Sequence, residues 1–260
     1  MLRSFLSRTS QRFSKKQELR IALCAERICF SGGHDVSLEK TGEPANWRPA
    51  LDALTQVLAQ HKGDTATVIL ADQFVRYALL PWSDTLKTHE QWLSLARHRF
   101  CAIHGPIAND WEIKFAETAP SGPRLACAVD RELVEELGSR FFSAGVRLAS
   151  VQPYLVAAFN RLRIGVLSST GSCWMVIEEP GRLTLALFLR GVWVAIRSRR
   201  ADEHWRRVLP EIIARESGLL GLEELCTRVI VCAQDPFDVA EHEDFRLDAL
   251  SWQDLSISAA

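Results

Sequence analysis

The chain has 260 residues, and its 31 Lys and Arg against 32 Asp and Glu leave a formal net charge of −1. This balance excludes a general electrostatic attraction to nucleic acid. No apolar run reaches the roughly 18 residues that span a bilayer, and the start lacks the apolar core of a secretory signal. Hydrophobic residues make up 47% and charged residues 24%, which is ordinary for a soluble globular protein.

Residues 1–18 differ from the rest and form a basic tail. Its only acid is Glu18, and its cations are Arg3, Arg8, Arg12, Lys15 and Lys16. Apolar residues recur in it at helical spacing, at Leu2, Phe5, Leu6 and Phe13. Such a segment can make a peripheral contact with an anionic membrane or a partner, and it also resembles a transit peptide. A disordered tail is the plainer interpretation, and all of these stay open.

Three short apolar runs follow the tail, then a helix-period stretch and a fourth run. The three runs are Leu19–Cys24, Arg27–Ser31 and Val36–Glu39. The stretch begins near Trp47 and continues through Leu51, Leu54 and Leu58, and the fourth run ends at Leu70. Short β-prone runs with turn residues between them are typical of hairpins, so the segment predicts three strands, a helix and a strand.

The middle of the chain predicts further α/β structure. The turn Ala71-Asp72-Gln73 leads into a strand that ends before Pro81, and a helix is expected over Thr88–His104. A hairpin is expected from Trp111–Phe115 and Arg124–Val129. Asp130 is the expected cap of the next helix, followed by a strand over Val146–Val151 and a helix over Pro153–Leu162.

The order of elements then repeats, about 150 residues further along. Strands are predicted for Ser172–Glu178, Arg182–Leu189 and Val192–Arg197, then a helix-period stretch from Trp205, then a run over Arg228–Cys232. Both helical stretches carry a Trp near their start. A repeat of this kind is the sequence signature of two equivalent structural units.

Strand-strand-strand-helix-strand used twice is the layout of the two halves of actin-like folds. We therefore expect an α/β protein with an actin-like (RNase H-like) two-lobed fold built on two βββαβ repeats. The predicted domains are a basic tail (1–18), a first lobe with an α/β insertion (19–167) and a second lobe (168–260). The second lobe is expected to be truncated, because the chain runs out before the last helix of a full half.

Three runs carry a resemblance to a known family. These are TATVILADQFVRYALLPW, which ends at Trp82, LACAVDRELVEEL over Leu125–Leu137, and VRLASVQPYLVAAFN over Val146–Asn160. They resemble PilM-type proteins of type IV pilus assembly and, equally, the cytoplasmic domain of the type II secretion L component (GspL). The resemblance covers most of residues 18–235 and is one of pattern, without a diagnostic motif.

The resemblance implies a bacterial cytoplasmic scaffold under the inner membrane. Such a protein binds the cytoplasmic end of a small bitopic inner-membrane protein, or the secretion ATPase. The secretion component continues into a membrane span, which this sequence lacks, so the pilus-type member is the closer likeness. Two alternatives stay open: an ATP-binding phosphotransferase or ATPase of the same fold, and an orphan interaction domain outside pilus systems.

The turns that hold phosphate in actin-like ATPases depart from the pattern. Such turns carry an acid and glycines, whose backbone N–H groups wrap the phosphate. The first, Cys24–Arg27, has no Gly. The second contains Glu178, Glu179 and Gly181, but its Pro180 lacks an N–H and its acids repel phosphate. These three residues are weak cofactor-binding candidates at most, so we expect no catalysis and no cofactor, and residual binding of ATP stays open.

No other pattern indicates catalysis or a metal. His98, Cys101 and His104 do not share one helical face. The seven cysteines form no CxxC pair and lie mostly inside apolar runs, as reduced core thiols of a cytoplasmic protein do. Walker and GxSxG motifs are absent from the sequence.

The expected partner-binding residues are Trp82, Arg197, Arg199 and Arg200. Trp82 follows a strand end, and aromatic residues are enriched among interface hot spots. The arginines form a cation cluster that could steer an anionic partner. The plainer interpretations, an edge-packed Trp and a solvated basic helix start, stay open beside this one.

Overall fold

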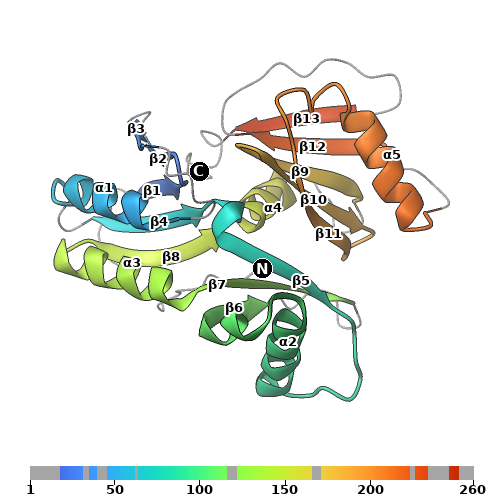
Figure 1. Ribbon diagram of the computed structural model, residues 1–260, viewed down its shortest axis with the longest axis horizontal. Coiled ribbons are helices and arrows are strands. Elements are labelled where there is room, and N and C mark those ends of the chain that lie inside the picture. Colours follow the sequence, from blue (N-terminus) through green and yellow to red (C-terminus); the bar gives the residue numbers. More distant parts are fainter. Residues whose placement is uncertain are drawn as a thin grey trace.

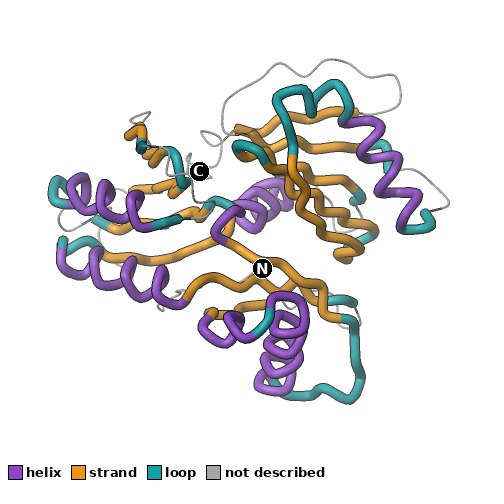
Figure 2. Tube along the Cα trace, viewed as in Figure 1, coloured by secondary structure: helices purple, strands orange, loops and turns teal. Residues whose placement is uncertain are grey.

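The computed structural model describes residues 18–31, 35–39, 46–61, 64–115, 122–165, 171–222, 226–233 and 246–251. Figure 1 and Figure 2 show two large sheets with a smaller α/β unit beside the first of them. The predicted basic tail falls almost wholly on residues 1–17, which lie outside the described residues.

The first large sheet has the strand order β3-β2-β1-β4-β8. Its elements are β1 (Glu18–Leu23), β2 (Arg27–Phe30), β3 (Asp35–Ser37), α1 (Arg48–Leu58), β4 (Thr65–Leu70), α3 (Arg131–Ser143) and β8 (Arg147–Pro153). β1 pairs antiparallel with β2 and parallel with β4, and β4 pairs parallel with β8. β4 is buried along nearly its whole length, as expected for a parallel strand covered on both faces.

The second large sheet repeats this arrangement strand for strand, in the order β11-β10-β9-β12-β13. Its elements are β9 (Cys173–Glu179), β10 (Arg182–Leu189), β11 (Val192–Arg200), α5 (Leu209–Leu219), β12 (Arg228–Ala233) and β13 (Arg246–Ser251). β9 pairs antiparallel with β10 and parallel with β12, which in turn pairs parallel with β13. The two predicted βββαβ units are therefore confirmed, with the fourth strand parallel to the first in each.

The smaller unit is a three-stranded antiparallel sheet in the order β5-β7-β6, with α2 packed on it. Its elements are η1 (Asp72–Phe74), β5 (Val75–Leu80), α2 (His89–His104), η2 (Pro106–Asp110), β6 (Trp111–Phe115) and β7 (Arg124–Asp130). α2 begins with a capping box between Thr88 and Gln91. The predicted hairpin of β6 and β7 is confirmed.

Helix α4 (Tyr154–Gly165) lies between the two large sheets, against β4 and β8 on one side and β9 on the other (Figure 1). Tyr154, Leu155 and Phe159 on it are buried, and the Phe159 ring contacts Phe188 and Trp193 of the second half at centroid distances of 4.8 and 4.6 Å. One apolar core therefore runs from the first sheet through α4 into the second.

Two details of the second half differ from the sequence expectations. The helix predicted from Trp205 begins at Leu209, because Pro210 is tolerated only in a first helical turn. Trp205 lies in the preceding turn and is still buried, at 5% exposure. Strand β13 was not predicted. The second lobe was also expected to be truncated after its last strand. Residues 252–260, where this expectation applies, lie outside the described residues.

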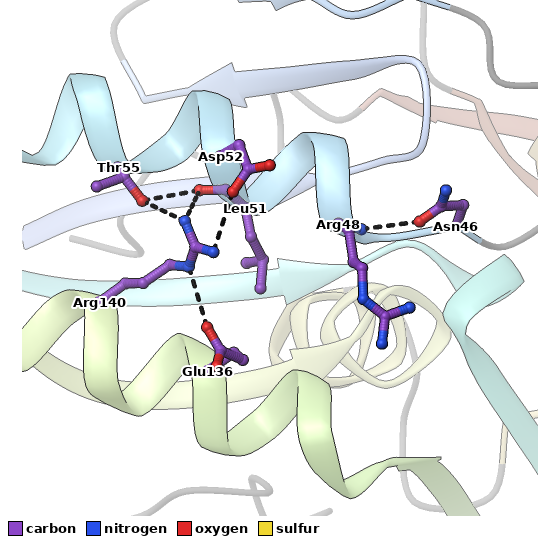
Figure 3. Close-up of polar contacts among 7 residues, drawn as sticks. All are labelled: Asn46, Arg48, Leu51, Asp52, Thr55, Glu136 and Arg140. Atoms are coloured by element: carbon purple, nitrogen blue, oxygen red, sulfur yellow. Dashed lines mark hydrogen bonds and ion pairs between the residues drawn. The ribbon is translucent and has the colours of Figure 1, made fainter.

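Arg140 of α3 connects α3 to α1 on the first sheet (Figure 3). Its guanidinium donates to the Leu51 carbonyl at 3.1 Å and to Thr55 Oγ1 at 2.7 Å, and it pairs with Asp52 at 3.0 Å and Glu136 at 3.3 Å. At the other end of α1, Asn46 Oδ1 accepts from the Arg48 backbone N–H. The described part of the chain contains no helix long and apolar enough to cross a membrane.

Replacing Arg140 by Ala should lower the free energy of unfolding by about 2 kcal/mol, because hydrogen bonds to a charged group contribute about 1.5–3 kcal/mol. The measurement is urea unfolding at pH 7. The control is Arg131→Ala on the same helix, an exposed position, which should stay within about 0.5 kcal/mol of wild type. Equal effects of the two substitutions would contradict the role given to Arg140.

Candidate functional site

The two large sheets meet where β4 and β9 end. Asp72 begins the short helix η1 directly after β4, and Glu179 is the last residue of β9. Both carboxylic acids are buried, with exposures of 0% and 2%. Buried acids are rare in proteins unless they are paired, so this junction is a candidate functional site.

Hydrogen bonds of the acid pair join four elements, η1, β9, β5 and α4, and a neighbouring bond reaches a fifth, β12. The Asp72 backbone N–H donates to Glu179 Oε1 at 2.6 Å, which joins η1 to β9. Asp72 Oδ1 accepts from the Tyr77 hydroxyl of β5 and from the Leu155 N–H of α4 at 3.2 Å. Beside them, the Tyr154 hydroxyl donates to the Ala233 carbonyl of β12 at 3.3 Å. Protein hydrogen bonds therefore hold one carboxyl oxygen of each acid at the junction.

Burial makes the acid pair hold a proton at neutral pH. Desolvation raises the pKa of Asp72 to about 6, against the lowering effect of its bond from Tyr77. Desolvation, and then the Asp72 charge, raise the pKa of Glu179 to about 8. Within the described ranges, Asp72 Oδ2 and Glu179 Oε2 have no hydrogen-bond partner. Since two interacting acids titrate as a unit, the pair carries one proton near pH 7.

The second predicted phosphate turn is a tight hairpin turn between β9 and β10. Glu179 is paired with Arg182 across it, Pro180 takes its second position, and Gly181 has the positive φ of 73° that its third position requires. Of the three weak cofactor candidates, Glu179 points into the junction and Gly181 shapes the turn. Glu178 is half-buried one residue before Glu179, on the opposite face of β9.

The first predicted phosphate turn is closed by its own backbone. The Cys24 N–H donates to the Arg27 carbonyl at 3.0 Å. Burial, and then the neighbouring Cys29, raise the pKa of the buried Cys24 thiol well above its usual value. Glu179 contributes to the same shift, so this turn lies near the acid pair. A thiol with a raised pKa stays protonated and is a poor nucleophile.

The four predicted partner-binding residues lie in three different settings. Trp82 is 39% exposed and follows β5, where its ring lies 5.9 Å from Trp92 and from the Arg124 guanidinium. Arg197 of β11 pairs with Glu216 of α5 at 3.2 Å. Arg199 and Arg200 line a pocket at the place where β11 contacts β5.

A second pocket, of about 450 Å³, is lined by acids at the start of α3. Two of them already serve the fold. Asp130 caps α3 and accepts from the Trp47 indole at 3.3 Å, and Glu132 pairs with Arg48 at 2.8 Å. This pocket is therefore explained by helix capping and by the contact between α1 and α3.

Metal ligands do not gather in the described part of the chain, where no group of three or more His, Cys, Asp and Glu is placed to hold an ion. The His104 ring packs against Trp111 at a centroid distance of 5.1 Å, and the Cys101 thiol lies 3.5 Å from Asn109 Oδ1. Both residues therefore have packing roles at the end of α2.

The comparison with solved structures decides the fold class. The chain is similar to a structure titled "PilM-PilN type IV pilus biogenesis complex", with a TM-score of 0.60, 12% identity, and 85% of this chain and 82% of that chain covered. The cytoplasmic domain of EpsL, an inner-membrane component of the Vibrio cholerae type II secretion system, matches with a TM-score of 0.55, 12% identity, and 92% and 91% covered.

The fold is actin-like. A Bacteroides thetaiotaomicron protein with an actin-like ATPase fold and unknown function also matches, with a TM-score of 0.54, 12% identity, and 86% and 84% of the two chains covered. The expected actin-like fold of the PilM and GspL type is thereby confirmed. No protein-family profile matches the sequence, and no curated protein sequence matches it either.

Sequence reasoning missed the centre of the site. Asp72 was expected only as part of a turn, and Tyr77 and Tyr154 were not singled out. A usable signal was present, because Asp72 directly follows the buried strand β4, at the sheet edge where the parallel strands β4 and β8 end. The contact with Glu179 joins residues 107 positions apart, which spacing alone does not indicate.

Glu179→Gln should remove a pH dependence of stability. The folded pKa of Glu179, about 8, lies above its ordinary value of 4.5, so the native state binds the extra proton and wild-type stability falls as pH rises from about 4.5 to about 8. The variant should therefore gain stability relative to wild type between pH 5 and pH 8, by at least about 1.4 kcal/mol, the equivalent of one pKa unit.

The measurement is urea unfolding of both proteins at pH 5, 6, 7 and 8. Glu178→Gln, one residue earlier and half-buried, is the matched control and should keep the wild-type slope. A wild-type slope that survives in Glu179→Gln would contradict the assignment of the proton to this pair.

Proposed function

We propose that the protein is a non-catalytic cytoplasmic scaffold of a type IV pilus or type II secretion-like assembly platform. Its role is to bind the cytoplasmic segment of an inner-membrane partner. The observation that carries the proposal is the shared fold, over more than four fifths of each chain, with PilM in the PilM–PilN complex and with the EpsL cytoplasmic domain. The secretion ATPase is a second candidate partner from the same likeness.

The geometry of the junction supports a non-catalytic role. Glu179, the acid at the end of the second turn, is buried and accepts the Asp72 N–H, so it does not face solvent where a metal or water would bind. Pro180 has no N–H to offer a phosphate, and the Cys24 N–H is occupied within the first turn. ATP-dependent chemistry on this fold is the alternative that this arrangement disfavours.

The partner surface that we propose is centred on Trp82. Its ring is 39% exposed beside the Arg124 guanidinium, and an aromatic residue with an adjacent Arg is a common interface anchor. Arg199 and Arg200 supply positive charge on β11, whereas Arg197 is already paired with Glu216. The basic tail of residues 1–18 is a further proposed contact, with the membrane surface.

We predict no ATP hydrolysis above background by the purified chain with Mg²⁺. The measurement is phosphate release over hours at micromolar protein, with the chain heated to unfold it as the blank. Turnover that is lost in both Glu178→Ala and Glu179→Ala would contradict the non-catalytic proposal and favour the ATPase alternative.

Trp82→Ala should reduce capture of the inner-membrane partner by about tenfold or more, because truncation of an interface hot spot costs about 2 kcal/mol or more. The assay is affinity capture from detergent extract of the source cells, with captured proteins identified by mass spectrometry. A bitopic protein with a short cytoplasmic segment is expected.

The matched control is Phe142→Ala on α3, an exposed apolar residue outside the proposed surface. It should leave capture unchanged, and equal melting temperatures should show that both variants fold. If Trp82→Ala and a triple Ala variant at Arg197, Arg199 and Arg200 both capture the partner fully, the proposed surface is wrong.

A further inference from the structure

A pocket of about 400 Å³ lies between the small unit and the second large sheet. Its cations are four arginines: Arg76 of β5, Arg182 of β10, and Arg199 and Arg200 of β11. The remaining described residues that line it are Gln73, Pro180, Gly181 and Ser198, so it has no acidic side chain among them. Figure 1 shows β11 lying beside β5 at this place.

The strand pairing brings like charges together here. Arg182 and Arg200 lie directly opposite each other across β10 and β11, in a register that also pairs Thr184 with Ser198. Like charges at directly opposed positions of an antiparallel pair are destabilising. Arg76 approaches from β5, and the Arg182 charge, after burial, lowers its pKa. An anion held between these guanidinium groups would offset this repulsion.

Hydrogen bonds orient two of these side chains and leave donors unused. Arg76 Nη1 donates to the Gln73 carbonyl at 3.0 Å, and Arg182 Nη2 donates to Ser198 Oγ at 2.8 Å. Arg182 Nε is buried and has no hydrogen-bond partner among the residues that the structure describes. A buried donor without a partner is unfavourable, so its presence beside the other guanidinium groups points to a ligand that accepts hydrogen bonds.

The nearest acids balance these arginines only in part, because Asp72 and Glu179 both interact with the Arg182 charge. Asp72 and Glu179 directly precede the pocket residues Gln73 and Pro180 in the sequence. Both acids are buried, and they share one proton near pH 7. The pair therefore supplies about one negative charge against four guanidinium groups. A ligand with several negative charges would complete the balance.

We propose that this pocket binds a phosphate-bearing anion with at least two phosphate groups. Guanidinium groups reach it from three strands, which suits tetrahedral phosphates whose oxygens point in several directions. Its volume lies within the range of small-molecule sites. None of the described residues that line it is aromatic, so the proposed recognition is of the phosphates and not of a base. This binding proposal goes beyond the proposed scaffold function. An experiment can contradict one of the two proposals and leave the other intact.

The test is isothermal titration calorimetry of the full chain with pyrophosphate, in low salt at pH 7. Saturable binding is expected, weakened by added salt. Arg182→Gln and Arg200→Gln should each weaken it at least about tenfold, because each removes a charge-assisted hydrogen bond. Arg200 is exposed, so its variant keeps the test decisive if the substitution at Arg182 impairs folding. Arg215→Gln, an exposed arginine on α5, removes the same charge elsewhere and should bind as wild type does.

Two further arms identify the source of the phosphate. The Kd for ADP should lie within about threefold of the Kd for pyrophosphate, because the proposed pocket does not recognise the base. Co-sedimentation with cardiolipin vesicles, whose headgroup carries two phosphates, against phosphatidylcholine vesicles, tests a lipid headgroup. Vesicle binding that is lost in the Arg182 and Arg200 variants would support the proposal and would identify a lipid headgroup as the source of the phosphates. No saturable binding of either probe, or binding that Arg182→Gln and Arg200→Gln leave intact, would overturn the proposal, as would ADP binding without pyrophosphate binding.

Discussion

The contact between Asp72 and Glu179 is the constraint around which the two halves are arranged. It joins the end of β4 to the end of β9 through the Asp72 N–H and a Glu179 carboxyl oxygen 2.6 Å away. The carboxyl group of Asp72 is held from two other elements, by the Tyr77 hydroxyl and the Leu155 N–H. Bonds in so dry an environment are strong when satisfied and unfavourable when broken.

Closure of this junction links the fold to the proposed function. In an actin-like ATPase the space between the halves receives a nucleotide; in this chain, acids, tyrosines and backbone groups form hydrogen bonds to one another where the two sheets meet. The exposed Trp82 ring is a surface where another molecule could bind, and so is the arginine pocket, whose Gln73 and Pro180 directly follow the two acids. A protein of this kind is suited to binding other molecules at its periphery while its halves stay joined.

The sequence was enough to predict the repeated unit, because its strands are short, β-branched and separated by turn residues. Helix starts followed from local chemistry, as at Thr88 and Asp130, whose side chains cap α2 and α3. The start of α5 was placed too early because Trp205 fits the helical spacing although it lies in a turn. β13 was missed because its six residues mix charged and apolar side chains without clear alternation.

The site was less predictable than the fold, for a physical reason. Glu179 was recognised as an acid in a turn, but its burial depends on η1 and α4, which approach it from the other half of the chain. Asp72 and Arg76 gain their roles from partners at Glu179 and Arg182, more than 100 positions away along the sequence. Such contacts depend on how the two halves pack against each other, and the spacing of residues along the sequence does not predict that packing.

The most direct test of the shared proton is carboxyl carbon NMR of the chain labelled with ¹³C at Glu and Asp side chains. One Glu resonance should titrate near pH 8 and disappear in Glu179→Gln, and an Asp resonance assigned by Asp72→Asn should titrate near pH 6. If every Glu and Asp carboxyl titrates at its ordinary value, near 4, the two halves are not joined by a protonated acid pair and the account of the junction is wrong.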